Sequence, residues 1–129
     1  AFLLATLLLS QECYAEISEA TAVKCIIGEA ENQGLDGMTA VAEAIRNRGT
    51  VKGVYGCKAE RREYRNKLIW ESIEQNARLA WRKSITSDLT NGATHWENTK
   101  AFGVPYWAKE MTVTAKIKDH TFFKKKSSQ

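Results

Sequence analysis

The chain has 129 residues, enough to bury one hydrophobic core but too few for a second catalytic domain. Hydrophobic residues make up 43% of it and charged residues 26%, a balance that excludes an intrinsically disordered chain. The net charge of +4 favours encounter with polyanions, which outside the cytoplasm are cell-wall polymers and membrane surfaces.

The chain starts with a run of apolar residues, 1–10, that is too short to span a bilayer as a helix. Its length fits the hydrophobic region of a signal peptide. We therefore expect residues 1–15 to be a truncated export signal, cleaved after Ala15, and residues 16–129 to form one exported domain without stable membrane insertion. A buried N-terminal helix and a lipid-modified Cys13 are the alternatives.

Loss of the signal would leave two cysteines, Cys25 and Cys57. An even count in an oxidising compartment favours a disulfide, and two free buried thiols are the alternative. The bridge would close a loop of roughly 30 residues and contribute about 3 to 4 kcal/mol. No C-x-x-C pair is present and His95 and His120 lie far apart, so we expect no metal site and no cofactor.

Two helices are predicted at the start of the domain. Ser18 can cap the first, whose apolar residues recur at helical spacing until it ends near residues 32–34. The second runs from Asp36, its expected N-cap, to Arg48, with Gly49 as its stop. Its alternate alanines allow a neighbouring helix to approach closely.

Residues 51–65 show no clear period and are predicted as loop. A long amphipathic core helix follows, indicated by apolar residues at i, i+4, i+8, i+11 and i+12: Ile69, Ile73, Ala77, Ala80 and Trp81.

The last third of the chain shows strand patterns. Asn91-Gly92 is a turn signal before a short strand at 93–97. Residues 111–118 alternate between apolar and polar, and a tight turn at Lys118-Asp119 leads to a partner strand at 120–123. Helices followed by a small antiparallel sheet predict an α+β fold, mainly helical, with the sheet in the C-terminal half.

Glu29 is the candidate for acid catalysis. It follows Cys25 and Ile26 by one helical turn, so its carboxyl group lies on a small apolar strip near the helix end. Desolvation disfavours the ionised form, and a protonated Glu can donate to a leaving glycosidic oxygen. Taken alone, a Glu at such a place is more often solvated or paired with a cation.

Three ordered blocks resemble the signature of the SleB-like cell wall hydrolases, a family named for a spore-cortex-lytic enzyme. The stretch 27–30 (IGEA), followed by 40–48 (AVAEAIRNR), is similar to its G-E-A segment and its A-V-A-x-V-x-x-N-R helix. Residues 91–96 (NGATHW) resemble a G-A-x-x-[FHY] segment, and 117–123 (IKDHTFF) resemble a closing I-G-x-H-x-F-[YF] motif. The resemblance spans about residues 20–124.

The resemblance implies a lysozyme-like fold related to lytic transglycosylases, peptidoglycan glycan strands as substrate, and Glu29 as the catalytic residue. Two departures concern fine specificity. Asn32 and Gln33 stand where the family has a second acid, and Lys118-Asp119 replaces the glycine before the closing histidine.

Hydrolysis of a glycoside normally uses two carboxyl groups, whereas a lytic transglycosylase needs one. In the second case the muramoyl C6 hydroxyl attacks, and one Glu acts first as acid and then as base, leaving an anhydro-sugar end. Glu43 is the candidate for a second acid because its helical neighbours are small or polar and can border a groove. An exposed charge or a partner for Arg46 is the alternative.

Other residues offer hydrogen-bonding and aromatic groups that a sugar needs. We expect Asn47 to orient Glu29 and His120 to be a hydrogen-bonded support residue, and core packing is the alternative for Trp96. The candidate substrate-binding residues are Glu43, Asn47, His95, Trp96, Asn98, Tyr106 and His120.

The sequence therefore predicts an exported, monomeric enzyme that cleaves peptidoglycan glycan strands, either as a lytic transglycosylase or as a muramidase-type hydrolase. A non-catalytic wall-binding module is the main alternative, because it would use the same basic and aromatic surface. A nucleic-acid-binding protein is disfavoured by the export signal and by the lack of a basic stripe interleaved with aromatic residues.

Overall fold

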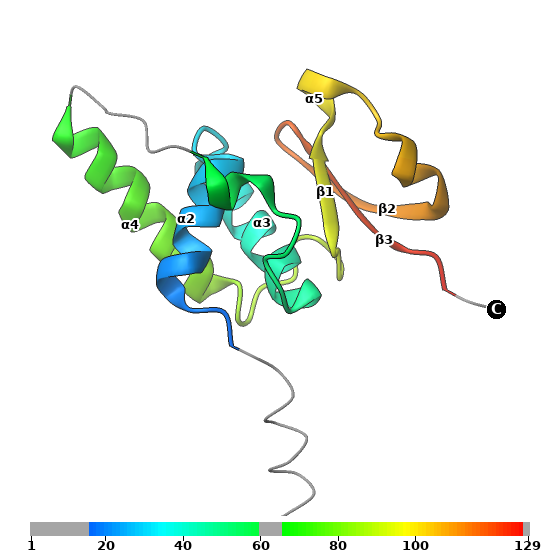
Figure 1. The fold of residues 1–129 in the computed structure, drawn as a ribbon, viewed down its shortest axis with the longest axis horizontal. Coiled ribbons are helices and arrows are strands. Elements are labelled where there is room, and N and C mark those ends of the chain that lie inside the picture. Colours follow the sequence, from blue (N-terminus) through cyan, green and yellow to red (C-terminus); the bar gives the residue numbers. More distant parts are fainter. Residues whose placement is uncertain (1–15, 60–65, 128–129) are drawn as a thin grey trace, which may run out of the picture.

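The computed structural model describes residues 16–59 and 66–127. Helices α2 (Glu19–Ala30), α3 (Gly34–Arg48) and α4 (Lys67–Lys83) pack on one side of the molecule, and an antiparallel sheet lies on the other (Figure 1). The strands are β1 (His95–Asn98), β2 (Met111–Ile117) and β3 (His120–Lys125), in the order β1-β3-β2. Short helices connect them: η1 (Tyr55–Lys58), α5 (Thr99–Phe102) and η2 (Tyr106–Glu110). The predicted α+β fold is confirmed.

Two predicted features fall partly or wholly outside the described residues. The expected signal peptide, residues 1–15, lies outside them, as do residues 60–65 of the predicted loop. The described part of that loop contains η1, a 3-10 helix that the sequence pattern did not indicate. None of the described helices is long and apolar enough to cross a membrane.

Helix α2 begins as predicted, because the Ser18 side chain accepts a hydrogen bond from the Thr21 N–H. It ends at Ala30, two residues before the predicted end. The Gln33 N–H bonds back to the Ala30 carbonyl, and Gly34, at a φ of 69°, lets the chain turn directly into α3.

That early turn corrects the predicted start of α3. The helix begins at Gly34 with Gln33 as its N-cap, so Asp36 lies in the first turn and is not the capping residue. Its charge still complements the helix dipole there. The predicted stop is confirmed, since Gly49 has a φ of 75° and its N–H bonds to the Ile45 and Arg46 carbonyls.

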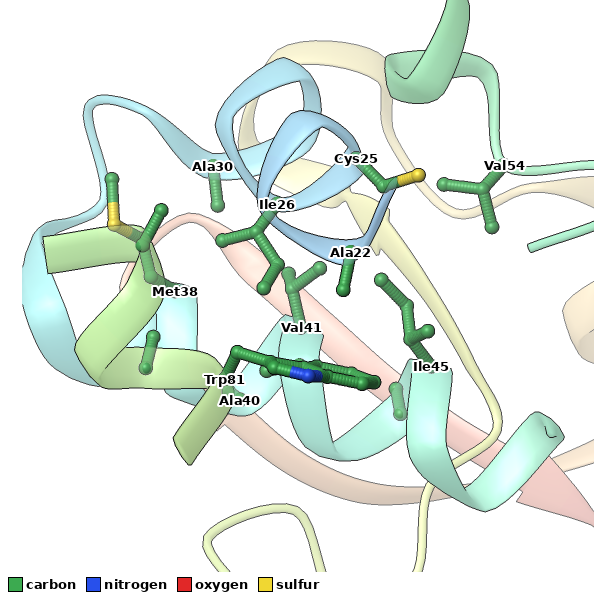
Figure 2. Close-up of a cluster of buried hydrophobic side chains, with 14 of the residues drawn as sticks. Ala22, Cys25, Ile26, Ala30, Met38, Ala40, Val41, Ile45, Val54 and Trp81 are labelled. Atoms are coloured by element: carbon green, nitrogen blue, oxygen red, sulfur yellow. The ribbon is translucent and has the colours of Figure 1, made fainter. Parts of the chain in front are cut away.

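The core lies between α2, α3 and the end of α4. Figure 2 shows Ala22 and Ile26 of α2 pointing toward Val41 and Ile45 of α3, with the ring of Trp81 from α4 beside them. The alanines of α3 are fully buried, as expected for a close helix contact.

Helix α4 is only partly the core helix that its apolar stripe predicts. Its C-terminal residues Ala77, Ala80 and Trp81 are buried, whereas Ile69 is 51% exposed. The N-terminal end of α4 reaches beyond α2, so no described helix covers it there (Figure 1).

The sheet follows the predicted turns. Asn91 and Gly92 both have positive φ before β1, and Lys118, at a φ of 55°, makes the β2–β3 turn. A bulge between Val113 and Ala115 interrupts the alternation of β2, and Val113 is 59% exposed instead of half-buried.

A two-way hydrogen bond joins the helices to the β2–β3 hairpin. The Gln33 Nε2 donates to Asp119 Oδ2, and the Asp119 N–H donates to Gln33 Oε1, both at 3.0 Å. Lys100 lies 3.7 Å from the other carboxylate oxygen of Asp119. We call this contact the Gln33–Asp119 latch. It fixes the hairpin, and with it His120, against the turn between α2 and α3.

Candidate active site

The Glu29 carboxylate is held between the helices and the sheet. Its Oε1 accepts a hydrogen bond from the Gly56 N–H of η1 at 2.9 Å. Its Oε2 accepts one from the Trp96 indole N–H of β1 at 3.3 Å. Two donors from segments far apart in sequence therefore fix its orientation, and the side chain stays partly accessible to solvent.

Segment η1 reaches Glu29 because two glycines let the backbones touch. A Cβ on Gly28 would overlap the Gly56 carbonyl, and one on Gly56 would lie 2.7 Å from the Glu29 backbone nitrogen. Next to Gly56, Cys57 forms a disulfide with Cys25 of α2, with their Cα atoms 3.9 Å apart. The predicted bridge is thus present, and it fastens η1 to the helix that carries Glu29.

Two cavities meet at Glu29. One, of about 800 Å³, lies between α2, η1 and the sheet; we call it the strand arm, and its lining includes Arg48, Tyr55, His95, Trp96, Glu97, Asn98, Phe102, Trp107, Glu110, His120 and Lys125. The other, of about 870 Å³, lies along α2 and α4; we call it the helix arm, and its lining includes Glu19, Lys24, Glu31, Lys58, Trp70, Glu74 and Arg78. Gly28 and Glu29 line both. An extended ligand that occupied both arms would pass over the Glu29 carboxyl group.

The two tryptophan rings that line the strand arm, Trp96 and Trp107, pack against neighbouring side chains. The Arg48 guanidinium lies 5.7 Å from the centre of the Trp96 ring. The Trp107 ring lies 5.6 Å from His95 and meets Phe123 edge-on at 5.3 Å. These contacts hold both indoles in place before any ligand binds.

The two histidines of the strand arm both have a pKa below the ordinary value. Burial lowers the pKa of His95 below its ordinary value of 6.5, and the charges of Arg48 and Lys125 lower it further. Burial also lowers the pKa of His120, although the negative charges of Glu29 and Asp119 oppose this shift.

His120 does not make the hydrogen bond expected of a support residue. Its side chain is 3% exposed, and its Nδ1 has no hydrogen-bond partner among the described residues. Its ring instead packs against Phe122 at 6.2 Å. His120 lines the strand arm with Glu29.

The carboxylate of Glu43 is buried inside the helical part and borders neither cavity. It accepts hydrogen bonds from the Ser87 hydroxyl at 2.6 Å, the Leu89 N–H at 2.9 Å, and the N–H and hydroxyl of Thr90 at 2.9 and 3.0 Å. Only 3% of the residue is exposed. This corrects both expectations for Glu43, a groove residue or an exposed charge, because its bonds anchor the loop after α4. Arg46 pairs with Ser84 and the Trp81 carbonyl instead.

Of the three remaining candidate residues, one lines the strand arm and two do not. Asn98 lines the strand arm and caps α5 through the Ala101 N–H. Asn47 does not contact Glu29; its Nδ2 donates to the Ala93 carbonyl at 2.9 Å, which fixes the entry to β1. Tyr106 is 86% exposed and lines neither arm.

Known structures share this architecture. The catalytic domain of the germination-specific lytic transglycosylase SleB from Bacillus anthracis matches at 22% identity and a TM-score of 0.60, over 86% of this chain and 97% of that domain. The catalytic domain of the Bacillus cereus SleB protein matches at 21% identity and a TM-score of 0.58, over 85% and 93%. The chain has the SleB catalytic-domain fold. The expected lysozyme-like α+β fold is thereby confirmed. No protein-family model matches the chain, and no curated protein does.

Within this SleB fold, sequence reasoning missed one of the two donors to Glu29, the Gly56 N–H, and two aromatic residues of the strand arm. The Gly56 N–H carries no side-chain signal, but its place next to Cys57 would have brought it to α2 once the disulfide was assumed. Tyr55 and Phe102 lie in segments without a periodic pattern, so nothing local indicated that both line the strand arm.

Proposed function

We propose that the chain cleaves the glycan strands of peptidoglycan, with Glu29 as its catalytic acid. The observation that carries the proposal is the position of Glu29 where the two arms meet. A polymer in both arms would place one glycosidic bond at this carboxyl group. The SleB domains with the same fold support the proposal, since one of them is named a lytic transglycosylase. The resemblance of the sequence blocks around Glu29, at 91–96 and at 117–123 to the SleB-like cell wall hydrolases supports it too.

The proposed reaction is a transglycosylation that uses a single carboxyl group. Glu29 gives its proton to the leaving glycosidic oxygen as the bond from the muramoyl C1 breaks. The C6 hydroxyl of the same sugar then bonds to C1, and its proton passes to the Glu29 carboxylate. The hydrogen bonds from Gly56 and Trp96 keep the carboxylate oriented for both transfers.

Hydrolysis is the second candidate, and the lining of the strand arm is what favours it. Glu97 and Glu110 line this arm with Glu29, so either is a candidate to activate a water molecule. Glu43 is excluded from that role by its burial and its hydrogen bonds. The product distinguishes the two reactions, since transglycosylation leaves anhydro ends and hydrolysis leaves reducing ends.

The compartment in which the protein acts follows from its proposed substrate. We propose that the chain is exported and acts on the wall as a monomer, with the Cys25–Cys57 bridge formed in an oxidising compartment. The alternative of a wall-binding module without activity predicts attachment to peptidoglycan and no soluble products.

The test is a digestion of purified peptidoglycan by the oxidised protein, followed by mass spectrometry of the soluble fragments. Glu29→Gln should reduce product formation by at least about 100-fold, because the amide has the same shape but supplies no proton. Glu71→Gln is the matched control, since Glu71 is a carboxylate on the exposed face of α4 that lines neither arm. Wild-type product formation by Glu29→Gln would refute the assignment.

A further inference from the structure

The strand arm and the helix arm differ in chemistry. The strand arm is lined by four aromatic side chains, Tyr55, Trp96, Phe102 and Trp107. The described lining of the helix arm has one aromatic residue, Trp70, beside apolar residues and charged residues of both signs that include Glu19, Lys24, Lys58, Glu74 and Arg78. The two arms are therefore suited to different parts of a ligand.

The aromatic residues of the strand arm form two groups. Trp96 and Trp107, the aromatic floor, are partly buried and held by the contacts with Arg48, His95 and Phe123. Tyr55 and Phe102, the aromatic rim, are 85% and 79% exposed. A single exposed aromatic residue is ordinary, but two on one cavity, above an ordered floor of indoles, indicate a binding surface.

The charges of the arm favour an uncharged ligand. Two cationic side chains, Arg48 and Lys125, face three carboxyl groups, those of Glu29, Glu97 and Glu110, so no strong excess of one sign lines the arm, and burial keeps the pKa of His95 below its ordinary value. Pyranose rings match this lining, because they have apolar C–H faces that stack on aromatic rings and hydroxyl edges that bond to polar groups.

We propose that the aromatic rim, Tyr55 and Phe102, binds the sugar rings of an N-acetylhexosamine strand over the floor of Trp96 and Trp107. The strand arm then holds the sugar rings on one side of the glycosidic bond that lies at Glu29. The identity of the sugar rests on the proposed function, whereas the place of binding rests on the lining of the cavity. The rim residues come from η1 and α5, which lie on opposite sides of β1 in sequence and line one cavity in the fold.

The experiment measures binding without turnover. The oxidised Glu29→Gln protein is titrated with the N-acetylglucosamine tetramer by calorimetry, alone and with Tyr55→Ala or Phe102→Ala added. Each addition should raise the Kd roughly 5-fold, the effect of losing one aromatic contact. Tyr55→Phe, which keeps the ring, should bind as the parent does. Val104→Ala is the control, because Val104 is 75% exposed next to the rim segment but lines neither arm.

The outcomes separate this inference from the proposed function. Unchanged Kd values for Tyr55→Ala and Phe102→Ala, or an equal loss in Val104→Ala, would overturn the aromatic rim even if the enzyme cleaves peptidoglycan. Weaker binding confined to the rim variants would support it even if no cleavage is found. Because both rim side chains are exposed, their truncation leaves the core unchanged, and equal melting temperatures would verify this.

Discussion

At the scale of single residues, the Trp96 indole N–H is the one side-chain donor to the Glu29 carboxylate among the described residues. Trp96→Phe removes this hydrogen bond but keeps an aromatic ring in the wall of the strand arm. We expect kcat to fall roughly 10-fold, the usual effect of losing a hydrogen bond to a charged group, with KM nearly unchanged. Steady-state release of soluble fragments measures both constants.

A double variant tests whether Trp96 acts through Glu29. In the Glu29→Gln background, Trp96→Phe should cause no further loss of the residual rate, because the carboxylate that it orients is gone. A full additional 10-fold loss there would show that Trp96 acts independently of Glu29.

The residues of the site were predictable to the extent that their signals are local. Glu29 lies in a short block that resembles a known family motif, and the strand at 93–97 was predicted from the turn signal that precedes it. Glu43 was misjudged because its partners, Ser87, Leu89 and Thr90, lie in a loop with no pattern to connect it with α3. A buried carboxylate and an exposed one look alike in sequence when the partners are backbone N–H groups.

At the scale of elements, the contact between α2 and η1 decides the geometry of the site. The Cys25–Cys57 disulfide joins the two segments covalently, and the close contact of Gly28 with Gly56 brings their backbones together. Replacing Cys25 and Cys57 by Ser should lower the free energy of unfolding by about 3 kcal/mol, measured in urea. Activity should fall more than stability explains, because the Gly56 N–H is no longer fixed against Glu29.

Reduction provides the control for the disulfide. Dithiothreitol should lower the activity of the oxidised protein at a temperature where it stays folded, and should leave the Ser variant unaffected. If the reduced protein remained folded with full activity, η1 would not need the bridge to hold Glu29.

At the scale of the whole molecule, the groove exists because the sheet is held against the helices. Gln33 and Asp119, which form the latch, are 86 residues apart, and neither belongs to a periodic pattern. The sequence therefore predicted the helices, the hairpin and their order, but not where the hairpin packs against the helices. Periodicity reports which face of an element is buried, and the partner that buries it is set by long-range contacts.

Because of Asp119 in the latch and the two histidines, His95 and His120, we expect the free energy of unfolding to decrease as the pH falls. The pKa of Asp119 is lowered, first by the hydrogen bond from Gln33 and also by Lys100, despite an opposing effect of desolvation. Its contribution is therefore present above 3.8, the ordinary value, and is lost as the pH falls through the folded pKa. The pKa values of His95 and His120 are lowered too, so the unfolded chain binds protons first as the pH falls below 6.5.

We therefore expect the free energy of unfolding to decline between pH 7 and pH 5, which is the window of the histidines, and again below about pH 4, which is that of Asp119. His120→Phe should reduce the first decline, because Phe keeps an aromatic ring beside Phe122 but cannot be protonated. Urea unfolding at pH 7, 6 and 5 measures the slope in both proteins. An equal slope in the variant would mean that His120 binds protons alike in the folded and unfolded chains, and the first decline would then belong to His95 or to other groups.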